Sequence, residues 1–256
     1  SMGNVFQKIP KILVKIKPKL ILAGFDIGAN FSTFVSGAHL NIPIAHIQGG
    51  ELSGSIDESL RHSMSKFSNF HFVANVDAKK RLIKMGEIKN NIFVVGCPSI
   101  DALLQEETCT VTQIKNKFGI DYKKKYLILI QHPVTTETNS NKQILNTLKA
   151  LKNIKIQKLI IYPNNDAGSK KIIKELNKSK FKVVKTLNLM EYKTLLSKAS
   201  ILVGNSSSGI HEAATYRIPV VNIGSRQNGR LKPQNVISSS YEAQEIKKKI
   251  LYCLNN

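Results

Sequence analysis

The fold is decided by the stretch Ile201-Leu-Val-Gly-Asn-Ser-Ser-Ser-Gly-Ile-His-Glu-Ala-Ala-Thr-Tyr-Arg-Ile-Pro-Val-Val-Asn-Ile-Gly-Ser-Arg226. Its pattern predicts a short apolar strand, a turn of small polar residues, a helix that opens at the serines, and a second strand from Pro219. Free backbone N–H groups and the positive end of the helix dipole meet at such a turn, and Ser206 and Ser207 add hydroxyl donors. The stretch therefore predicts a βαβ unit with an anion site that fits a phosphate.

Side chains near this turn favour a nucleotide as the anion. Serines before a helix more often serve only as N-caps, and this simpler interpretation stays open. Glu212 follows one helical turn later, where its carboxylate is able to accept from ribose hydroxyls, and Arg226 and Arg230 follow the next strand. An acceptor, an anion cradle and cations in one βαβ unit together indicate a nucleotide-diphosphate site.

Length and composition indicate a globular protein with a substantial core. The chain has 256 residues, of which 42% are hydrophobic and 21% charged, which is more typical of two domains than of one. No apolar run reaches membrane-spanning length and the N-terminus lacks the profile of a secretory signal, so we expect a cytoplasmic protein with no membrane partner. Cys97, Cys109 and Cys253 lie far apart with no CxxC motif, so neither a disulfide framework nor a zinc site is expected.

The formal net charge of +21 raises the hypothesis of a nucleic-acid partner. The lysines, however, are scattered along helices and loops, with no basic stripe interleaved with aromatic residues and no Trp in the chain. We therefore expect no nucleic acid as partner. A positive field of this size would instead favour a small anionic substrate by electrostatic steering.

Alternating strand and helix patterns along the chain predict parallel sheets with helices on both faces. In the first half we expect strands at 19–24, 42–47, 71–74 and 92–95. We expect helices at 1–16, 57–67 and 77–85, a further helix that ends at 39, and helical residues that begin at 98. After a polar interval, 105–125, we expect strands at 126–130, 158–162 and 181–184 and helices at 141–151, 166–176 and 243–254. This predicts an α/β fold of two Rossmann-like domains, 1–110 and 111–256, with ligands at the carboxyl ends of the strands, in the cleft between them.

Several polar residues directly follow predicted strands. Asp26 follows the first strand, and Gln48-Gly-Gly-Glu51 follows the second, where paired glycines would let the backbone approach a ligand closely. Asp57 and Arg61 lie one turn apart at the start of the next helix, and His132 follows the first strand of the second half. Each has a simpler explanation: Asp57 as an N-cap, Asp57 with Arg61 as an ion pair, and His132 as a satisfied loop histidine.

Longer motifs stand in order along the chain: His46-Ile-Gln-Gly-Gly-Glu-Leu-Ser-Gly-Ser-Ile-Asp-Glu-Ser-Leu-Arg-His62, Gly96-Cys-Pro-Ser99, Gln131-His-Pro-Val-Thr-Thr-Glu137, Gly204-Asn-Ser-Ser-Ser-Gly209 and Asn222-Ile-Gly-Ser-Arg-Gln-Asn-Gly-Arg230. With these, the chain closely resembles the hydrolysing UDP-N-acetylglucosamine 2-epimerases over nearly its whole length. The resemblance implies a glycosyltransferase-B-like fold and catalysis without metal or cofactor. It further implies elimination of the nucleotide diphosphate across C1–C2 of the sugar, then addition of water, giving N-acetylmannosamine and UDP. We also expect a homo-oligomer, a dimer or a tetramer.

The resemblance implies acid–base roles for residues of the first half. Asp26 resembles the aspartate of the family's Gly-Asp-Arg turn, and Asp57 resembles a second acidic position, so both are candidates for proton transfer or charge stabilisation. Arg61 is expected to be a cation on the substrate side. Gln48 stands where much of the family has a glutamate, and an amide does not exchange protons as a carboxylate does. We therefore expect either that Glu51 takes over this role or that activity is altered.

In the second half, the resemblance implies contacts with the leaving group. His132 is similar to the family's histidine that faces the diphosphate and assists its departure. Ser206 and Ser207 match the phosphate cradle, Glu212 matches the ribose contact, and Arg226 matches the cation after the last sheet strand.

Three departures from the family, one of them Gln48, keep alternatives open. The Gly-Asp-Arg turn is replaced by Phe25-Asp26-Ile27, and the chain lacks the family's first βαβ portion, so we expect an incomplete N-terminal domain. A GDP-linked diacetamido-sugar 2-epimerase of the hydrolysing type shares the same motifs. A nucleotide-diphosphate-binding module without turnover is a third interpretation, supported by Gln48, Ile27 and the absent portion.

Overall fold

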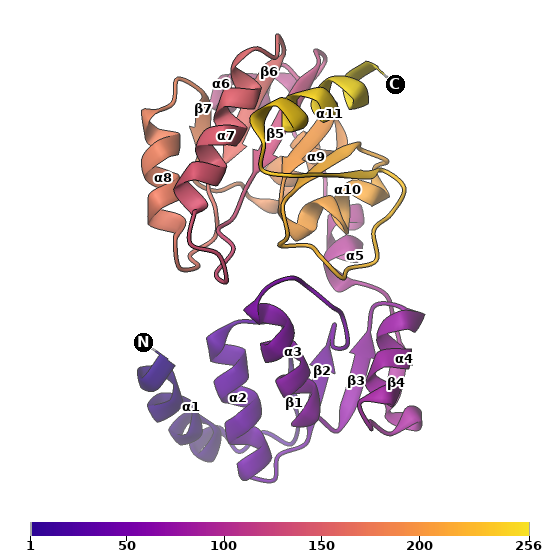
Figure 1. Cartoon of the computed structure of the whole chain (residues 1–256). Coiled ribbons are helices and arrows are strands. Elements are labelled where there is room, and N and C mark those ends of the chain that lie inside the picture. Colours follow the sequence, from indigo (N-terminus) through magenta and orange to yellow (C-terminus); the bar gives the residue numbers. More distant parts are fainter. Residues whose placement is uncertain (1, 256) are drawn as a thin grey trace. The chain divides into compact units, whose positions relative to one another are not determined.

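The computed structural model describes residues 2–255, which form two compact α/β units, one ending at Pro98 and one beginning at Ser99 (Figure 1). The expected boundary lay later, after residue 110. Leu103 of helix α5 (Pro98–Gln105) is buried in the core of the second unit, which explains why the second unit begins before α5 ends.

The first unit is a four-stranded parallel sheet with strands in sequence order. Its strands are β1 (Ile21–Gly24), β2 (Ile44–Ile47), β3 (Phe70–Val73) and β4 (Ile92–Val94). Its helices are α1 (Met2–Ile16), α2 (Gly28–His39), α3 (Ile56–Lys66) and α4 (Val76–Lys84), with a single 3-10 turn at Lys89–Asn91. Because each strand pairs with the next along the chain, right-handed crossovers place α2, α3 and α4 on the same face of the sheet.

Burial differs between the two faces of this sheet. On the helix-covered face, Leu13 of α1 and Phe34 of α2 pack with Ile44 of β2 in one apolar core. On the other face, Leu22 is 59% exposed, and Phe93 is exposed as well. The expected incompleteness of this domain stays a prediction.

The second unit is a six-stranded parallel sheet in the order β10-β9-β8-β5-β6-β7. Its strands are β5 (Tyr126–Ile130), β6 (Gln157–Ile161), β7 (Lys182–Val184), β8 (Ile201–Gly204), β9 (Val220–Ile223) and β10 (Val236–Ser239). Strand order runs outward from β5 in one direction and from β8 in the other. The winding therefore reverses between β5 and β8, and this switch point is where doubly wound sheets bind their ligands.

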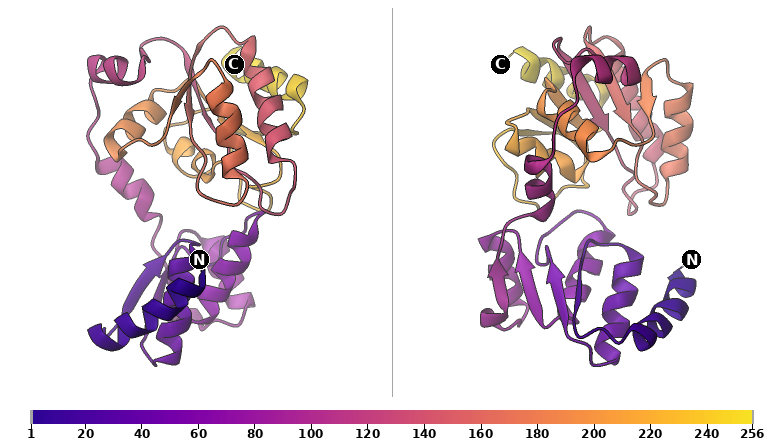
Figure 2. Two further views of the ribbon diagram at one scale, coloured as in Figure 1. Left: turned by 90° about the vertical axis from the view of Figure 1, so that its left-hand side faces the viewer. Right: turned by 180° about the vertical axis from the view of Figure 1, so that it is seen from behind.

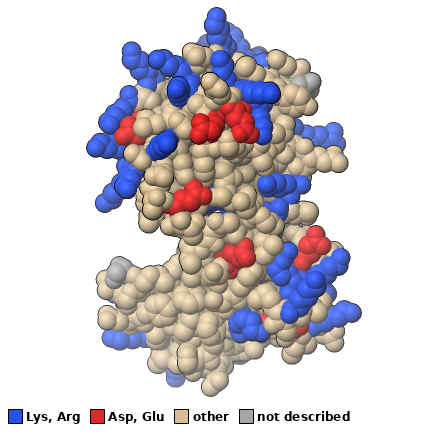
Figure 3. All heavy atoms as spheres, viewed as in Figure 1, with Lys and Arg blue, Asp and Glu red and all other residues tan. Residues whose placement is uncertain are grey.

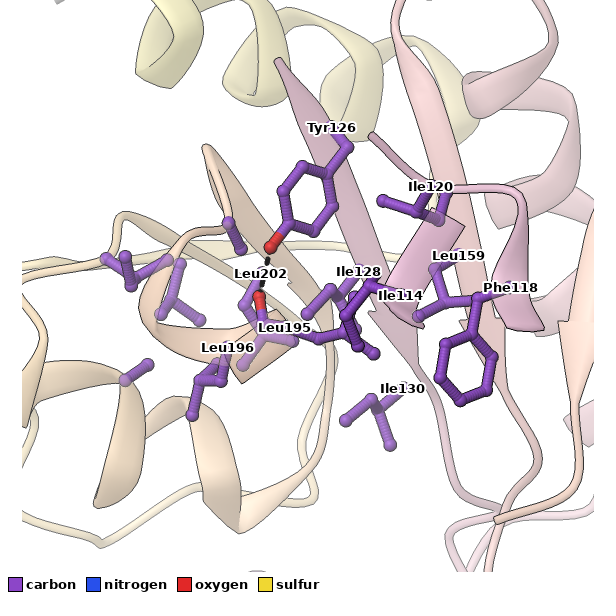
Figure 4. Close-up of a cluster of buried hydrophobic side chains, with 14 of the residues drawn as sticks. Ile114, Phe118, Ile120, Tyr126, Ile128, Ile130, Leu159, Leu195, Leu196 and Leu202 are labelled. Atoms are coloured by element: carbon purple, nitrogen blue, oxygen red, sulfur yellow. Dashed lines mark hydrogen bonds between the residues drawn. The ribbon is translucent and has the colours of Figure 1, made fainter. Parts of the chain in front are cut away.

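Helices cover both faces of the second sheet (Figures 1 and 2). They are α6 (Val111–Phe118), α7 (Ser140–Lys152), α8 (Ser169–Lys178), α9 (Leu189–Ser197), α10 (Glu212–Thr215) and α11 (Ala243–Asn255). Alternate residues of β5 face opposite layers: Ile128 packs with α6 and α9, and Leu129 with α7, α8 and α11. In the first layer the Tyr126 hydroxyl donates to the Leu195 carbonyl (Figure 4), so the buried phenol is satisfied.

The sequence predicted the strands from β1 to β9 and most helices, but it missed three elements. The polar interval 105–125 contains α6, and α9 and β10 were not foreseen. Both missed helices begin with a capping box, Thr110 with Gln113 and Asn188 with Glu191, which is a signal that sequence alone carries.

The prediction of a helix opening at the serines was wrong. The chain makes a 3-10 turn at Ser207–Gly209, and regular helix begins only at Glu212 and lasts four residues. The Ser206 hydroxyl accepts from the N–H of Ser208 at 3.3 Å, and such local bonds compete with helix formation. An anion bound at this turn would therefore depend on individual N–H and hydroxyl donors rather than on the dipole of a long helix.

Candidate functional site

Gly204 brings the carboxyl ends of β5 and β8 together at the switch point. It pairs with Ile130 in the parallel ladder and has φ +129°, a conformation that side chains rarely adopt. A Cβ atom at this position would overlap the Ile130 carbonyl group, far inside the ordinary contact range of 3.4–4 Å. Glycine is therefore required here, and the next residue, Asn205, is carried directly over the end of β5.

Asn205 links the loops that follow three strands. Its N–H donates to the Ile130 carbonyl at 3.1 Å, and its own carbonyl accepts from Gln227 Nε2 at 2.8 Å and Arg226 Nη1 at 3.4 Å. Its amide Oδ1 accepts from the N–H of His132 at 2.7 Å, while Nδ2 donates to the His132 carbonyl at 2.9 Å. The structure thus brings together His132 and Arg226, two residues predicted for the site.

The cations after β9 have defined partners. Arg226 Nη2 lies 3.9 Å from Asp166 Oδ2, and Arg230 Nη1 donates to His211 Nε2. His132 Nδ1 accepts from the N–H of Asn164 at 3.0 Å. Burial, and next the nearby Arg226 cation, lower the pKa of His132 from 6.5 to about 3. The imidazole is therefore neutral at physiological pH.

Ser206, Ser207 and Glu212 surround the turn after β8. Tyr192 contacts the Ser208 hydroxyl, and burial, followed by the charge of Glu212, raises the pKa of Tyr192, so the phenol stays protonated. Glu212 Oε2 is buried and accepts no hydrogen bond from any residue in 2–255. A buried carboxylate oxygen without a donor is costly, so a hydroxyl donor from a ligand would stabilise it.

One residue near the site, Glu137, was missed by sequence reasoning. Glu137 accepts from Gln143 Nε2 at 2.5 Å, from the Tyr241 hydroxyl at 2.9 Å, and from the Ser225 hydroxyl, so one carboxylate anchors the loop that carries Arg226. Glu137 also lines a cavity of about 490 Å³ at the start of α7. The sequence signal was its place in the motif that begins at Gln131. The buried amide of Gln131 has no partner among residues 2–255.

In the first unit, Arg61 and Asp26 form a partly buried ion pair. Arg61 is 3% exposed, and besides Asp26 its guanidinium donates to the Glu51 carbonyl at 2.7 Å. The predicted substrate-side cation is thus paired with a predicted acid of the same unit. Phe25 has φ +68°, a left-handed conformation that explains why glycine suits this position in the Gly-Asp-Arg turn.

Gln48, Gly49 and Gly50 follow β2 and lie against other residues of the first unit. Gln48, with φ +60°, donates from Nε2 to Cys97 Sγ at 2.7 Å. A Cβ atom at Gly49 would lie 2.8 Å from His46 Nδ1, and one at Gly50 would lie 2.7 Å from the Ala78 carbonyl oxygen. A side chain at either glycine would meet atoms of the same unit, and the expectation that the glycines let a ligand approach the backbone stays a prediction.

Asp57 lies in the first turn of α3, where Ser55 is the N-cap residue. The Ser55 hydroxyl donates to Asp57 Oδ2 at 2.8 Å. Arg61 pairs with Asp26. The simpler explanation of Asp57 as the N-cap residue is therefore wrong, because Ser55 holds that position.

Basic side chains do not form one stripe on the side of the molecule shown in Figure 3, where Lys and Arg gather at several separate places. Among residues 2–255, no cluster of three or more His, Cys, Asp or Glu side chains is arranged to hold a metal ion. Helices long and apolar enough to cross a membrane are likewise absent from this part of the chain.

The fold defines the class of protein. It matches the crystal structure of UDP-GlcNAc 2-epimerase from Neisseria meningitidis bound to UDP-GlcNAc, with a TM-score of 0.82 and 21% identity, over 98% of this chain and 72% of that chain. This is the glycosyltransferase-B-like α/β fold, as the sequence predicted.

The particular family follows from sequence comparison. The model of the UDP-N-acetylglucosamine 2-epimerase family matches residues 1–256, and the chain belongs to that family. It is 40% identical over 242 residues to the hydrolyzing UDP-N,N'-diacetylbacillosamine 2-epimerase of Legionella pneumophila, covering 93% of this chain and 64% of the relative. It is 35% identical over 249 residues to the UDP-N-acetylglucosamine 2-epimerase of Neisseria meningitidis serogroup B, covering 96% and 66%. The chain thus spans slightly less than two thirds of these relatives.

Proposed function

We propose that the chain belongs to a hydrolysing nucleotide-sugar 2-epimerase that converts UDP-N-acetylglucosamine to N-acetylmannosamine and UDP. The observation that carries the proposal is the buried, unpartnered Glu212 Oε2 beside the serine turn at the switch point. A ribose hydroxyl would supply the missing donor, while Ser206, Ser207 and Arg226 would bind the diphosphate. Family membership supports the same substrate class.

The proposed reaction has two steps, in which the nucleotide diphosphate leaves and C2 of the sugar is then inverted. In the first step a carboxylate removes the proton from C2, and the bond from C1 to the diphosphate oxygen breaks, giving a glycal and UDP. Asp57 and Glu51 are the candidates for this carboxylate, because Asp26 is tied to the Arg61 guanidinium. In the second step water adds its oxygen to C1, and a proton returns to C2 on the opposite face. His132 would donate to the departing diphosphate.

A second candidate substrate is a UDP-linked diacetamido sugar. The 40% identity to the Legionella pneumophila relative favours it. The GDP-linked diacetamido sugar stays a rival, and so does nucleotide binding without turnover, which the contact of the Gln48 amide with Cys97 favours. We also propose that the protein is cytoplasmic and forms a homo-oligomer, either a dimer or a tetramer.

The test is incubation of the chain with UDP-N-acetylglucosamine and with the UDP- and GDP-linked diacetamido sugars, followed by NMR of the released sugar. Release of free sugar inverted at C2 identifies the substrate. Binding of UDP without sugar release from any of the three substrates would favour the interpretation as a nucleotide-binding module over that as an enzyme. Absence of both binding and release would contradict the proposal.

A further inference from the structure

The side-chain amide of Asn205 forms its hydrogen bonds within the second unit. It is 1% exposed, and both of its amide atoms are bonded to the backbone of a single residue, His132. The Oδ1 atom accepts from the His132 N–H at 2.7 Å, and Nδ2 donates to the His132 carbonyl at 2.9 Å. Only an amide side chain of this length supplies one acceptor and two donors at adjacent atoms, so an acid or a hydroxyl would not replace it.

These two bonds restrict the His132 backbone from a distant part of the chain. Asn205 and His132 are 73 residues apart in sequence and follow the two strands that flank the switch point. Asn205 is itself fixed by the bond from its N–H to the Ile130 carbonyl and by Gln227 Nε2 on its own carbonyl. The position from which the imidazole projects is therefore fixed by β8 as well as by β5.

One nitrogen of the His132 imidazole already accepts a hydrogen bond. The backbone N–H of Asn164 donates to His132 Nδ1 at 3.0 Å, and this nitrogen has to be unprotonated to accept it. In the neutral ring the proton consequently resides on Nε2. Burial and the Arg226 cation disfavour a second proton, so the ring is a hydrogen-bond donor without a charge.

We propose that Asn205 is a positioning residue that holds the His132 imidazole in the neutral Nε2–H form, aimed as a donor at an oxygen of the bound diphosphate. The inference rests on the proposed function for its ligand and deepens the role of His132. A neutral Nε2–H group stabilises the developing negative charge of the leaving group by a hydrogen bond, and the ring does not have to gain a proton to donate it.

The chain offers a matched control in Asn222, a second buried amide at the same sheet. Asn222 lies on β9, pairs in register with Gly204, and has an Nδ2 atom without a partner among residues 2–255. Truncation of either residue to alanine removes one buried amide, directly after β8 for Asn205 and within the neighbouring β9 for Asn222. Only the Asn205→Ala change removes the contacts with His132.

The first measurement is nitrogen NMR of the imidazoles in the ligand-free chain, with the His132 signals assigned from a His132→Gln variant. We expect an unprotonated Nδ1 and a protonated Nε2 that do not change between pH 8 and pH 5, in the wild-type chain and in Asn222→Ala. In Asn205→Ala we expect averaging of the two tautomers. A proton on Nδ1 in the wild-type chain would overturn the inference whether or not any variant folds, and so would a fixed Nε2–H form in folded Asn205→Ala.

The second measurement is the affinity for UDP by calorimetry in a double-mutant cycle. We expect Asn205→Ala to weaken UDP roughly tenfold, as for loss of one hydrogen bond to a charged group, and to have little further effect in a His132→Ala background. Equal losses in both backgrounds would show that Asn205 acts on the fold and not through the imidazole. Failure of the wild-type chain to bind UDP would remove the proposed function, while the tautomer measurement would still decide the inference.

Discussion

Replacement of Gly204 by alanine is expected to destabilise the second unit strongly, because the site of the added methyl group is already occupied. Gly204 has φ +129°, and strain of this kind costs about 1–3 kcal/mol for a residue with a side chain. The added Cβ would also overlap the Ile130 carbonyl group, so β5 and β8 would have to separate.

Separation of the two strands would weaken further bonds. The Asn205 N–H donates to the Ile130 carbonyl, and the Asn205 side chain holds the His132 backbone. If these hydrogen bonds contribute about 1 kcal/mol each, Gly204→Ala should lower the free energy of unfolding by about 4 kcal/mol or more.

The matched control is Gly119→Ala in the same unit. Gly119 also has positive φ, +69°, but no atom lies within 4 Å of its would-be Cβ, so only backbone strain of about 1 kcal/mol is expected. Urea unfolding followed by circular dichroism compares the two variants. Equal losses of stability would refute the argument that close approach of β8 to Ile130 requires glycine.

Three further predictions address function and pH. Glu212→Ala should weaken UDP binding in calorimetry by about 1–3 kcal/mol, whereas the surface change Glu245→Ala should not; unchanged affinity in Glu212→Ala would remove the ribose assignment. If Glu51 is the working carboxylate, Glu51→Gln should abolish sugar release while UDP binding is retained. Sugar release from Gln48→Glu but not from the natural chain would show that the natural chain binds the nucleotide without turnover. Burial lowers the pKa of His46 from 6.5 to about 3, so the unfolded chain binds more protons in this window and the free energy of unfolding should fall as pH drops from 6.5 towards 3. Urea unfolding at stepped pH should show a smaller fall in His46→Phe, and an identical fall would exclude His46 as a cause.

Local pattern in the sequence determined most helices and strands and the place of the candidate anion-binding turn. Strand and helix periodicity involves residues two to four positions apart, so β5, β8 and α7 were predictable from their own residues. The small residues from Gly204 to Ser207 were sufficient to predict a turn with free donors. Capping boxes would have added α6 and α9.

Only the tertiary structure decided which side chains meet. Arg61 is bonded to Asp26, 35 residues away, although Asp57 lies closer in sequence, and Glu137 reaches Tyr241 across 104 residues. No fixed spacing encodes such pairs, because they depend on which strands become neighbours and on which loops follow them.

The interrupted helix after β8 shows the same limit. The sequence predicted regular helix from the serines, but the Ser206 hydroxyl binds locally, and a Cβ at Gly209 would approach Val220 to 2.8 Å. The sequence by itself therefore determined the α/β class, the family resemblance and the candidate turn. The strand order set by tertiary packing decided that His132, Asn205 and Arg226 share one edge of the sheet, because backbone pairing between β5, β8 and β9 brings their carboxyl ends together.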